Sequence, residues 1–189
     1  MYLFYNVKTT GPVYLADRIV QFAWLLTDEE GNEIIRDDYL IQPDGWISIP
    51  TDATEIHGVT FEDCVRHGNP LDQVLRAFTE ALSKAKFQVC HNVEFDSNMV
   101  NAEMQRCGLH ASQEMLSSTK SICTMLYSTD YVQKRGNYGR FKWPRLQELH
   151  FKLFGKEFHS AHNAMVDVEA TRKCFFKLIE LQIIEPYAL

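Results

Sequence analysis

Three short stretches of the chain gather polar side chains where packing alone would not require them. They read Asn-Val-Lys-Thr-Thr-Gly at residues 6–11, His-Asn-Val-Glu-Phe-Asp at residues 91–96 and Ala-His-Asn-Ala-Met-Val-Asp at residues 161–167. Carboxylates, imidazoles and ammonium groups are the side chains that exchange protons or balance the charge of ions. Acid-base or ion-dependent chemistry is therefore the chemistry that these stretches could support.

Asn6 and Lys8 stand at an unusual place in the first stretch. The apolar run at residues 2–5 predicts a buried strand, and strand alternation puts residues 6 and 8 on the same face. Two polar side chains thus project together from the end of an apolar segment, and one of them carries a positive charge.

Each of these residues also has a purely structural interpretation. Asp96 and Asp167 fit the first turn of a helix, where a carboxylate favours the helix dipole. Asn163 fits an N-cap, and His162 fits a surface histidine whose ring nitrogens are satisfied. Taken one residue at a time, these interpretations stay open.

The elements that must position the three stretches follow from the periodicity of apolar residues. Strands are expected at residues 2–7, 18–27, 33–42 and 87–90, and Gly31-Asn32 is a hairpin signal between the second and third. Helices are expected at residues 70–85, 94–107, 144–154 and 163–182, with a helical turn near 119–127. Early strands followed by alternating strands and helices predict an α/β layer with a mixed sheet.

Length and composition limit the classes of protein. The 189 residues fit one domain, and the formal net charge of −6 means that any contact with nucleic acid must come from a local basic patch. The five scattered cysteines fit reduced, packed thiols rather than disulfides or a zinc site. No apolar run reaches the roughly 18 residues that a membrane span needs, so we expect a soluble, cytoplasmic protein with no membrane contact.

Taken together, five ordered motifs resemble a known family. They are FYNVKTTG, RIVQFAW, IHGVT, HNVEFD and HNAMVDVEAT, and they extend over nearly the whole chain. The set resembles the DnaQ-like 3'-5' exonucleases of the RNase H-like superfamily, specifically the DEDDh subgroup, and is similar to the epsilon proofreading subunit of bacterial DNA polymerase III. The resemblance implies a single exonuclease-like domain over residues 1–189, with a mixed five-stranded sheet flanked by helices.

The resemblance also implies a chemistry. Members of the family use two divalent ions, Mg²⁺ or Mn²⁺, held by four carboxylates, to hydrolyse the terminal phosphodiester at a 3' end, with a histidine as general base. On this chain the histidine position falls on His162, and two ligand positions fall on Asp96 and Asp167. The other two ligand positions fall on Asn6 and Lys8.

The chain departs from the family at these two positions. Four carboxylates supply about −4, whereas two carboxylates and an ammonium supply about −1, which leaves a second dication unbalanced. We expect Lys8 to reach toward Asp96 or Asp167 in place of a metal, so that the site holds at most one ion. The rate of hydrolysis should then be lower by at least ~10³-fold. The alternative is that Lys8 turns outward and leaves a weakened one-metal site. Natural loss and deliberate inactivation are both open, because each replacement is a single base change.

Residues 134–145 form the one basic stretch in an acidic chain, with five basic and no acidic residues. Arg140 and Lys142 are interleaved with Tyr138, Phe141 and Trp143. This mixture suits the binding of a single nucleic-acid strand, because cations contact the phosphates while aromatic rings stack on the bases. The structural alternative is a solvated loop that Trp143 anchors.

The resemblance adds residues that would frame the terminal nucleotide. These residues are Thr9, Thr10, Gly11, His57, Asn92 and Phe95. The expected partners are 3' ends of single-stranded DNA or RNA, and DNA polymerase or repair proteins. The alternative functions are a silent nucleic-acid-binding module and a protein-interaction module of a replication or repair assembly.

Overall fold

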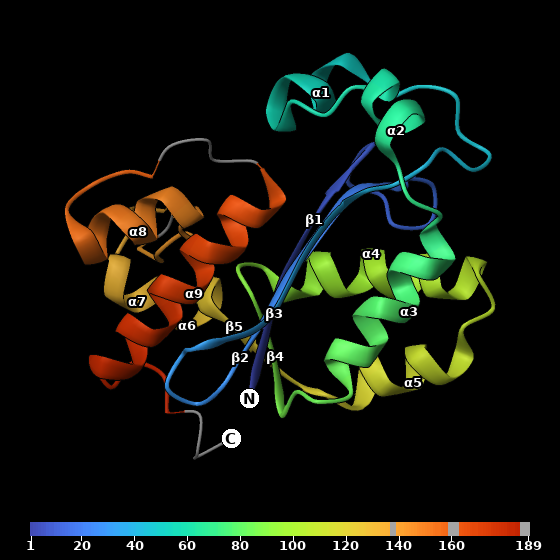
Figure 1. Ribbon diagram of the computed structural model, residues 1–189. Coiled ribbons are helices and arrows are strands. Elements are labelled where there is room, and N and C mark those ends of the chain that lie inside the picture. Colours follow the sequence, from blue (N-terminus) through green and yellow to red (C-terminus); the bar gives the residue numbers. More distant parts are fainter. Residues whose placement is uncertain (137–138, 159–162, 186–189) are drawn as a thin grey trace.

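The computed structural model describes residues 1–136, 139–158 and 163–185. A five-stranded sheet forms the centre of the molecule, in the order β3-β2-β1-β4-β5 (Figure 1). The strands are β1 (Tyr2–Thr9), β2 (Ile19–Thr27), β3 (Glu33–Leu40), β4 (Phe87–Cys90) and β5 (Lys120–Cys123). β1 pairs antiparallel with β2 and parallel with β4, so the predicted mixed five-stranded sheet is confirmed.

Helices cover both faces of this sheet. One side carries α3, α4 and α5, the other carries α8 and α9, and α1 and α2 lie beyond one end of the strands (Figure 1). Their bounds are α1 (Thr51–His57), α2 (Phe61–His67), α3 (Leu71–Leu82), α4 (Val93–Arg106), α5 (His110–Ser118), α6 (Thr124–Tyr127), α7 (Thr129–Val132), α8 (Leu146–Phe154) and α9 (Ala164–Glu180).

The alternation of β1 divides the core into two parts. Leu3, Tyr5 and Val7 pack with residues of α3 and α4, whereas Tyr2 and Phe4 pack with residues of α9. Even-numbered residues of β1 therefore face α9, because successive side chains of a strand point to opposite faces. Asn6 and Lys8 continue this even-numbered row beyond the apolar part of the strand.

The predicted secondary structure differs from the observed one in two respects. The predicted helical turn at residues 119–127 is wrong for its first half, which forms β5, an edge strand that pairs parallel with β4. The helices α1, α2, α5 and α7 were not predicted. They have seven, seven, nine and four residues and few or no buried side chains, so they lack the apolar stripe that periodicity detects.

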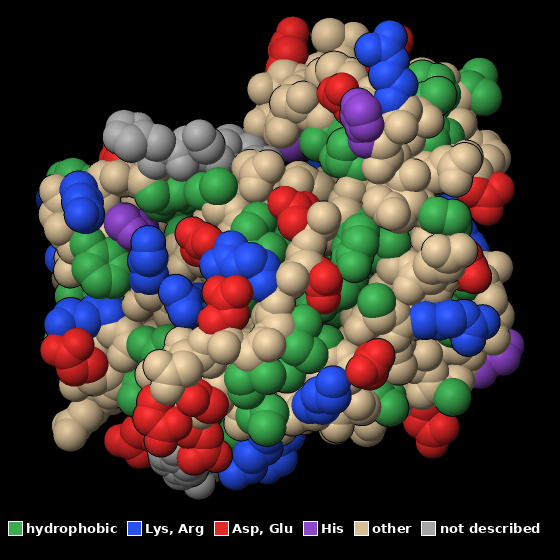
Figure 2. All heavy atoms as spheres, viewed as in Figure 1, with side chains coloured by type: hydrophobic (Ala, Val, Ile, Leu, Met, Phe, Trp, Pro, Cys, Tyr) green, Lys and Arg blue, Asp and Glu red, His purple; other side chains and the backbone are tan. Residues whose placement is uncertain are grey.

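None of the helices within the described residues is long and apolar enough to cross a membrane. Charged side chains are spread among apolar ones over the face that Figure 2 shows.

Candidate functional site

The candidate site lies where β1 extends beyond its parallel neighbour. Of the residues of β1, only Tyr2, Leu3 and Phe4 pair with β4. The backbone groups of β1 that follow Phe4 therefore need other hydrogen-bond partners on the edge that faces β4. Asp96, in the first turns of α4, fills the place of the missing strand: its Oδ1 accepts hydrogen bonds from the Val7 backbone N–H and from Asn6 Nδ2, each at 3.0 Å. The site therefore forms because a parallel strand ends and a helix begins.

Asp96 is almost completely buried, with 1% of its surface exposed. Burial raises the pKa of its carboxyl to about 7, because the ionised form loses its hydration. The hydrogen bond from Val7 and the charge of Lys8 lower the pKa, but they offset only part of the effect. At neutral pH this carboxyl group is therefore close to its midpoint of ionisation.

Lys8 points into the site and pairs with Asp167. Its Nζ lies 2.5 Å from Asp167 Oδ2, and both residues are buried. Of the two partners expected for Lys8, the structure selects Asp167, and the alternative of an outward lysine is wrong. A charge-assisted contact of this length places the ammonium directly against the carboxylate.

The start of α9 fixes the position of Asp167. Asn163 is the N-cap, and its side chain accepts hydrogen bonds from the backbone N–H groups of Met165 and Val166. Gln21, from β2, accepts a further hydrogen bond from the backbone N–H of Ala164 at 3.1 Å. Both contacts satisfy backbone donors at the start of α9, and the one from Gln21 links the first turn, which carries Asp167, to β2.

His162, the predicted general base, lies outside the described residues, as does Tyr138 of the basic stretch.

A groove of about 390 Å³ opens beside the Lys8–Asp167 pair. Of the predicted nucleotide-framing residues, it brings together Thr9, Thr10, Gly11, His57 and Phe95. It is also lined by Asn6, Val7, Lys8, Pro12, Asp52, Ala53 and Ile56. Asn92 is not among the lining residues; it precedes α4 in the left-handed conformation, with a φ of 86°.

His57 fastens α1 to the end of β1. Its Nδ1 accepts a hydrogen bond from the Val59 backbone N–H at 3.1 Å, so its Nε2–H donates to the carbonyl oxygen of Thr9 at 3.2 Å. Both contacts are to backbone atoms. The histidine therefore sets the width of the groove between α1 and β1.

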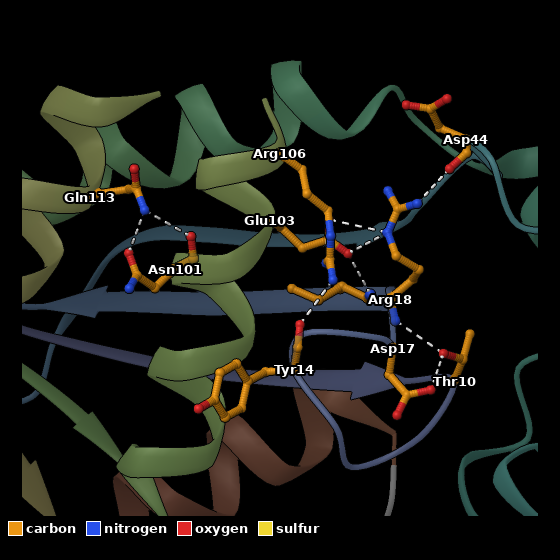
Figure 3. A network of polar contacts seen from close by, with 10 residues as sticks. Thr10, Tyr14, Asp17, Arg18, Asp44, Asn101, Glu103, Arg106 and Gln113 are labelled. Atoms are coloured by element: carbon orange, nitrogen blue, oxygen red, sulfur yellow. Dashed lines mark hydrogen bonds and ion pairs between the residues drawn. The ribbon is translucent and has the colours of Figure 1, made fainter. Parts of the chain in front are cut away.

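A buried carboxylate anchors the loop that forms the wall of the groove (Figure 3). Glu103, on α4, is completely buried and accepts from Arg18 Nε at 2.9 Å and from the Ile19 backbone N–H at 3.0 Å. Arg106 pairs with the same carboxylate and donates to the carbonyl oxygen of Tyr14 at 2.9 Å. The loop between β1 and β2 is thereby tied to α4 at two points.

Asp17 shapes the part of this loop that faces the groove (Figure 3). Its carboxylate accepts from Thr10 Oγ1 at 2.9 Å and from the Val13 backbone N–H at 2.8 Å. A Cβ at Gly11 would lie 2.6 Å from the same carboxylate, so a larger residue there would have to displace Asp17 from these contacts. The backbone around Thr10 and Gly11 is consequently fixed in the described structure.

The basic stretch lies outside the groove but is attached near it. Arg140 and Lys142 are exposed, Trp143 is 63% exposed, and none of the three lines the groove. His91, directly after β4, donates from Nε2–H to the carbonyl oxygen of Pro144 at 2.9 Å, and burial lowers the pKa of its imidazole to about 4. This contact ties the base of the stretch to the strand end beside the site.

The donor atoms around Lys8 differ from the four carboxylates that the resemblance implies. Lys8 offers no acceptor, Asp96 Oδ1 is already shared by two donors, and Asp167 Oδ2 faces an ammonium. Asn6 Oδ1 is buried and has no hydrogen-bond partner, so a neutral oxygen stands at a position where the resemblance implies a carboxylate. Within the described residues, no three His, Cys, Asp or Glu side chains are grouped so that they could hold a metal ion.

Sequence reasoning missed several residues that build the site. Gln21 and Asp17 hold the helix and the loop that border it, and Ile56 and Ala53 line the groove from an unpredicted helix. Asp17, five residues beyond the Gly11-Pro12 turn signal, could have been suspected as a turn carboxylate. Gln21 gave no signal, because its partner lies 143 positions away.

Comparison with known proteins confirms the predicted family. A family model described as Exonuclease matches residues 8–175. PolC-type DNA polymerase III of Listeria monocytogenes is 30% identical over 181 residues, which are 95% of this chain and 11% of that protein. The corresponding protein of Streptococcus pneumoniae strain R6 is 31% identical over 179 residues. The chain thus spans about a tenth of the length of these relatives.

Solved structures share the fold. A structure of exonuclease I superimposes with a TM-score of 0.79 at 22% identity and covers 96% of this chain and 42% of that one. E. coli exonuclease I in complex with a dA16 oligonucleotide gives 0.76 at 23% identity, with 95% and 40% covered, and its zinc-bound complex with single-stranded DNA gives 0.77 at 24%, with 96% and 40% covered. The RNase H-like fold expected from the motifs is confirmed.

Proposed function

The chain belongs to the Exonuclease family, and from this premise we propose that it holds the 3' end of a single nucleic-acid strand while hydrolysing it poorly or not at all. One observation carries the proposal: Lys8 Nζ lies 2.5 Å from Asp167 Oδ2, where the family places metal-ligating carboxylates. In this proposal the fold of a nuclease is retained, and the charge of the Asp167 carboxylate is neutralised by the Lys8 ammonium of the same chain.

The charge balance supports the loss of hydrolysis. Asp96 and Asp167 contribute at most about −2 and Lys8 about +1, so the site carries about −1 before any ion arrives. Since the pKa of Asp96 is raised to about 7, the negative charge is smaller still at neutral pH. Two dications in this site would repel each other with little to offset the repulsion.

Lys8 cannot replace a metal in the reaction. An ammonium can neutralise a carboxylate, but it does not lower the pKa of a bound water as a dication does. If the missing ions account for several kcal/mol of barrier reduction, the rate falls by at least ~10³.

Retention of binding is supported by residues that the two replacements leave intact. Thr9, Thr10 and Gly11 line the groove together with the apolar residues Ile56 and Phe95. Exonuclease I binds single-stranded oligonucleotides in its solved complexes, and PolC-type relatives are DNA polymerases. We therefore propose 3' ends of DNA or RNA as the ligand and a DNA polymerase assembly as the setting.

The direct test is a nuclease assay with a single strand labelled at its 5' end, incubated with Mn²⁺ or Mg²⁺. We expect no steady shortening from the 3' end. His162→Ala is the matched control, because it removes the predicted general base and should leave the background unchanged. Steady 3' shortening with Mn²⁺ that His162→Ala abolishes would contradict the proposal.

Reversion tests the cause. Asn6→Asp combined with Lys8→Glu should restore hydrolysis by at least ~10³, because it returns two anionic ligands to the site. Lys84→Glu, an exposed substitution two residues after the end of α3, controls for the lysine-to-glutamate part of this charge change. If the double variant stays inactive while its fold is intact, the defect lies elsewhere. Retained binding is tested separately by titration of a single strand at low salt, where phosphate contacts are strongest.

A further inference from the structure

A second pocket lies between the end of α8 and the middle of α9. Its volume is about 480 Å³, and it is lined by His150, Phe154, Lys156, Glu157, Phe158 and Lys173. It shares no residue with the groove beside Lys8. On the α8–α9 side of the molecule, at the left of Figure 2, blue, purple and green side chains lie close together.

Aromatic rings form one wall of this pocket. The ring centroid of His150 lies 4.7 Å from that of Phe154 and 5.2 Å from that of Phe158. Gln147 fixes the backbone of Phe158, since it donates to the Phe158 carbonyl oxygen at 2.8 Å and accepts from the Phe158 N–H at 3.3 Å. The wall is therefore built by the fold and suits a flat aromatic ligand.

His150 contributes a hydrogen-bond acceptor to the pocket. The residue is only 5% exposed, and its Nδ1–H donates to the carbonyl oxygen of Lys156 at 2.9 Å. In the neutral ring, Nε2 is then an acceptor, and it makes no hydrogen bond to any residue that the structure describes. This nitrogen is not among the described side-chain atoms that are buried without a partner, so it is accessible at the pocket, where a ligand N–H donor can reach it.

Two cations stand at the rim. Lys156 and Lys173 are exposed, and neither forms an ion pair with another described residue. With Glu157 the rim carries a net charge of about +1, in a chain whose formal net charge is −6. The rim therefore favours an anionic group on the ligand.

From this combination we propose that the pocket binds a nucleotide with an amino-bearing base. The base lies against the rings of Phe154 and Phe158, its amino group donates to His150 Nε2, and its phosphate contacts Lys156 and Lys173. The same chemistry is offered by a free nucleoside monophosphate and by one nucleotide of a single strand. The site does not depend on the groove or on the loss of hydrolysis there.

Calorimetric titration at pH 7.5 with adenosine 5'-monophosphate tests the site. We expect saturable binding that is at least ~10-fold tighter than that of inorganic phosphate and of purine riboside 5'-monophosphate, which lacks the amino group. Lys156→Ala combined with Lys173→Ala should weaken binding by at least ~10-fold. Lys177→Ala on the same helix, paired with Glu180 and outside the pocket, should leave it unchanged.

A spectroscopic readout separates the pocket from a diffuse charge effect. The Hε1 resonance of His150 should shift on titration with adenosine monophosphate and stay unmoved by inorganic phosphate. A single strand that displaces the nucleotide identifies the strand as the source of the ligand, whereas a strand that does not compete identifies the free nucleotide. Equal affinity for phosphate and adenosine monophosphate, or no binding at 10 mM of either, would overturn the proposal.

Discussion

Among single residues, the buried ion pair between Lys8 and Asp167 has the clearest consequence for the stability of the fold. Lys8 and Asp167 face each other with little access to water, and removal of one partner takes this opposite charge away from the other, which stays buried. A paired buried charge need not stabilise a fold, but an unpaired one destabilises it strongly.

Replacement of Lys8 by Met should therefore lower the free energy of unfolding by about 3–5 kcal/mol, measured by urea denaturation. Lys84→Met, in an exposed pair with Glu80, should change it by less than about 1 kcal/mol. Addition of Asp167→Asn to Lys8→Met should recover much of the loss. Equal effects of the two single lysine variants would contradict the burial argument.

Asp96 gives a prediction for pH. Its folded pKa is about 7 against an ordinary value of 3.8, so between these values the folded state retains a proton that the unfolded state has released. Its contribution makes the free energy of unfolding fall as pH rises from about 4 to 7, by about 4 kcal/mol in total. Asp96→Asn removes this term while it keeps an oxygen for Val7.

The difference in stability between Asp96→Asn and the parent should accordingly grow in favour of the variant as pH rises through that window. The parent alone is a poor indicator, because His91, with its pKa lowered to about 4, contributes stability that is lost as pH falls below about 6.5. Denaturation curves of both proteins at pH 4 to 8 measure the difference. A constant difference over this range would contradict the raised pKa.

The local arrangement of these residues could be predicted from the sequence, but their contacts with distant parts of the chain could not. Strand alternation placed Asn6 and Lys8 on one face, and the structure confirms that both point toward the candidate site. The choice of Asp167 over Asp96 as the partner of Lys8 could not be predicted, because it depends on how α9 docks 159 positions later in the chain.

At the scale of elements, the start of α9 positions half of the site. Asn163 satisfies two backbone donors of the first turn, and Gln21 satisfies a third. The helix therefore enters the site at a fixed angle and depth.

Asn163→Ala should lower the free energy of unfolding by about 1 kcal/mol, because two helix N–H groups lose their acceptor. Asn163→Asp, which keeps the acceptor, should restore most of this stability. Thermal unfolding of the two variants measures the comparison. An alanine variant as stable as the parent would show that water or another group replaces the cap.

Long apolar elements were predictable, and short polar ones were not. The strands β1, β2 and β3 and the helices α3, α4 and α9 follow from apolar runs and periodicity, within a few residues at their ends. β5 has two buried residues of four, and its strand conformation comes from pairing with β4 rather than from its own sequence. The groove could be predicted only in part, because one of its walls is α1, a short helix that the sequence pattern does not indicate.

At the scale of the whole molecule, a net acidic protein carries one exposed basic stretch next to the candidate site. The formal net charge is −6, yet Arg140 and Lys142 stand exposed beside Phe141 and Trp143. Contact with a nucleic-acid strand would therefore be local. The salt dependence of its binding constant should reflect only the few phosphates that these cations contact.

Arg140→Ala combined with Lys142→Ala should weaken single-strand binding and reduce the slope of log K against log salt by about 1.4, which is two phosphate contacts at about 0.7 each. Lys84→Ala combined with Lys177→Ala removes the same charge elsewhere and should leave the slope nearly unchanged. Fluorescence anisotropy of a labelled strand at several salt concentrations gives both values. Equal slopes for the two double variants would remove the basic stretch from the interface.

If the Lys8 ammonium has replaced the metals of the site, the chain as given should bind no Mn²⁺ stoichiometrically. The variant that combines Asn6→Asp with Lys8→Glu should bind two ions. Calorimetric titration of both proteins with Mn²⁺ measures the difference. Two tightly bound Mn²⁺ ions in the chain as given, lost on Asp167→Asn, would contradict the replacement of the metals by Lys8.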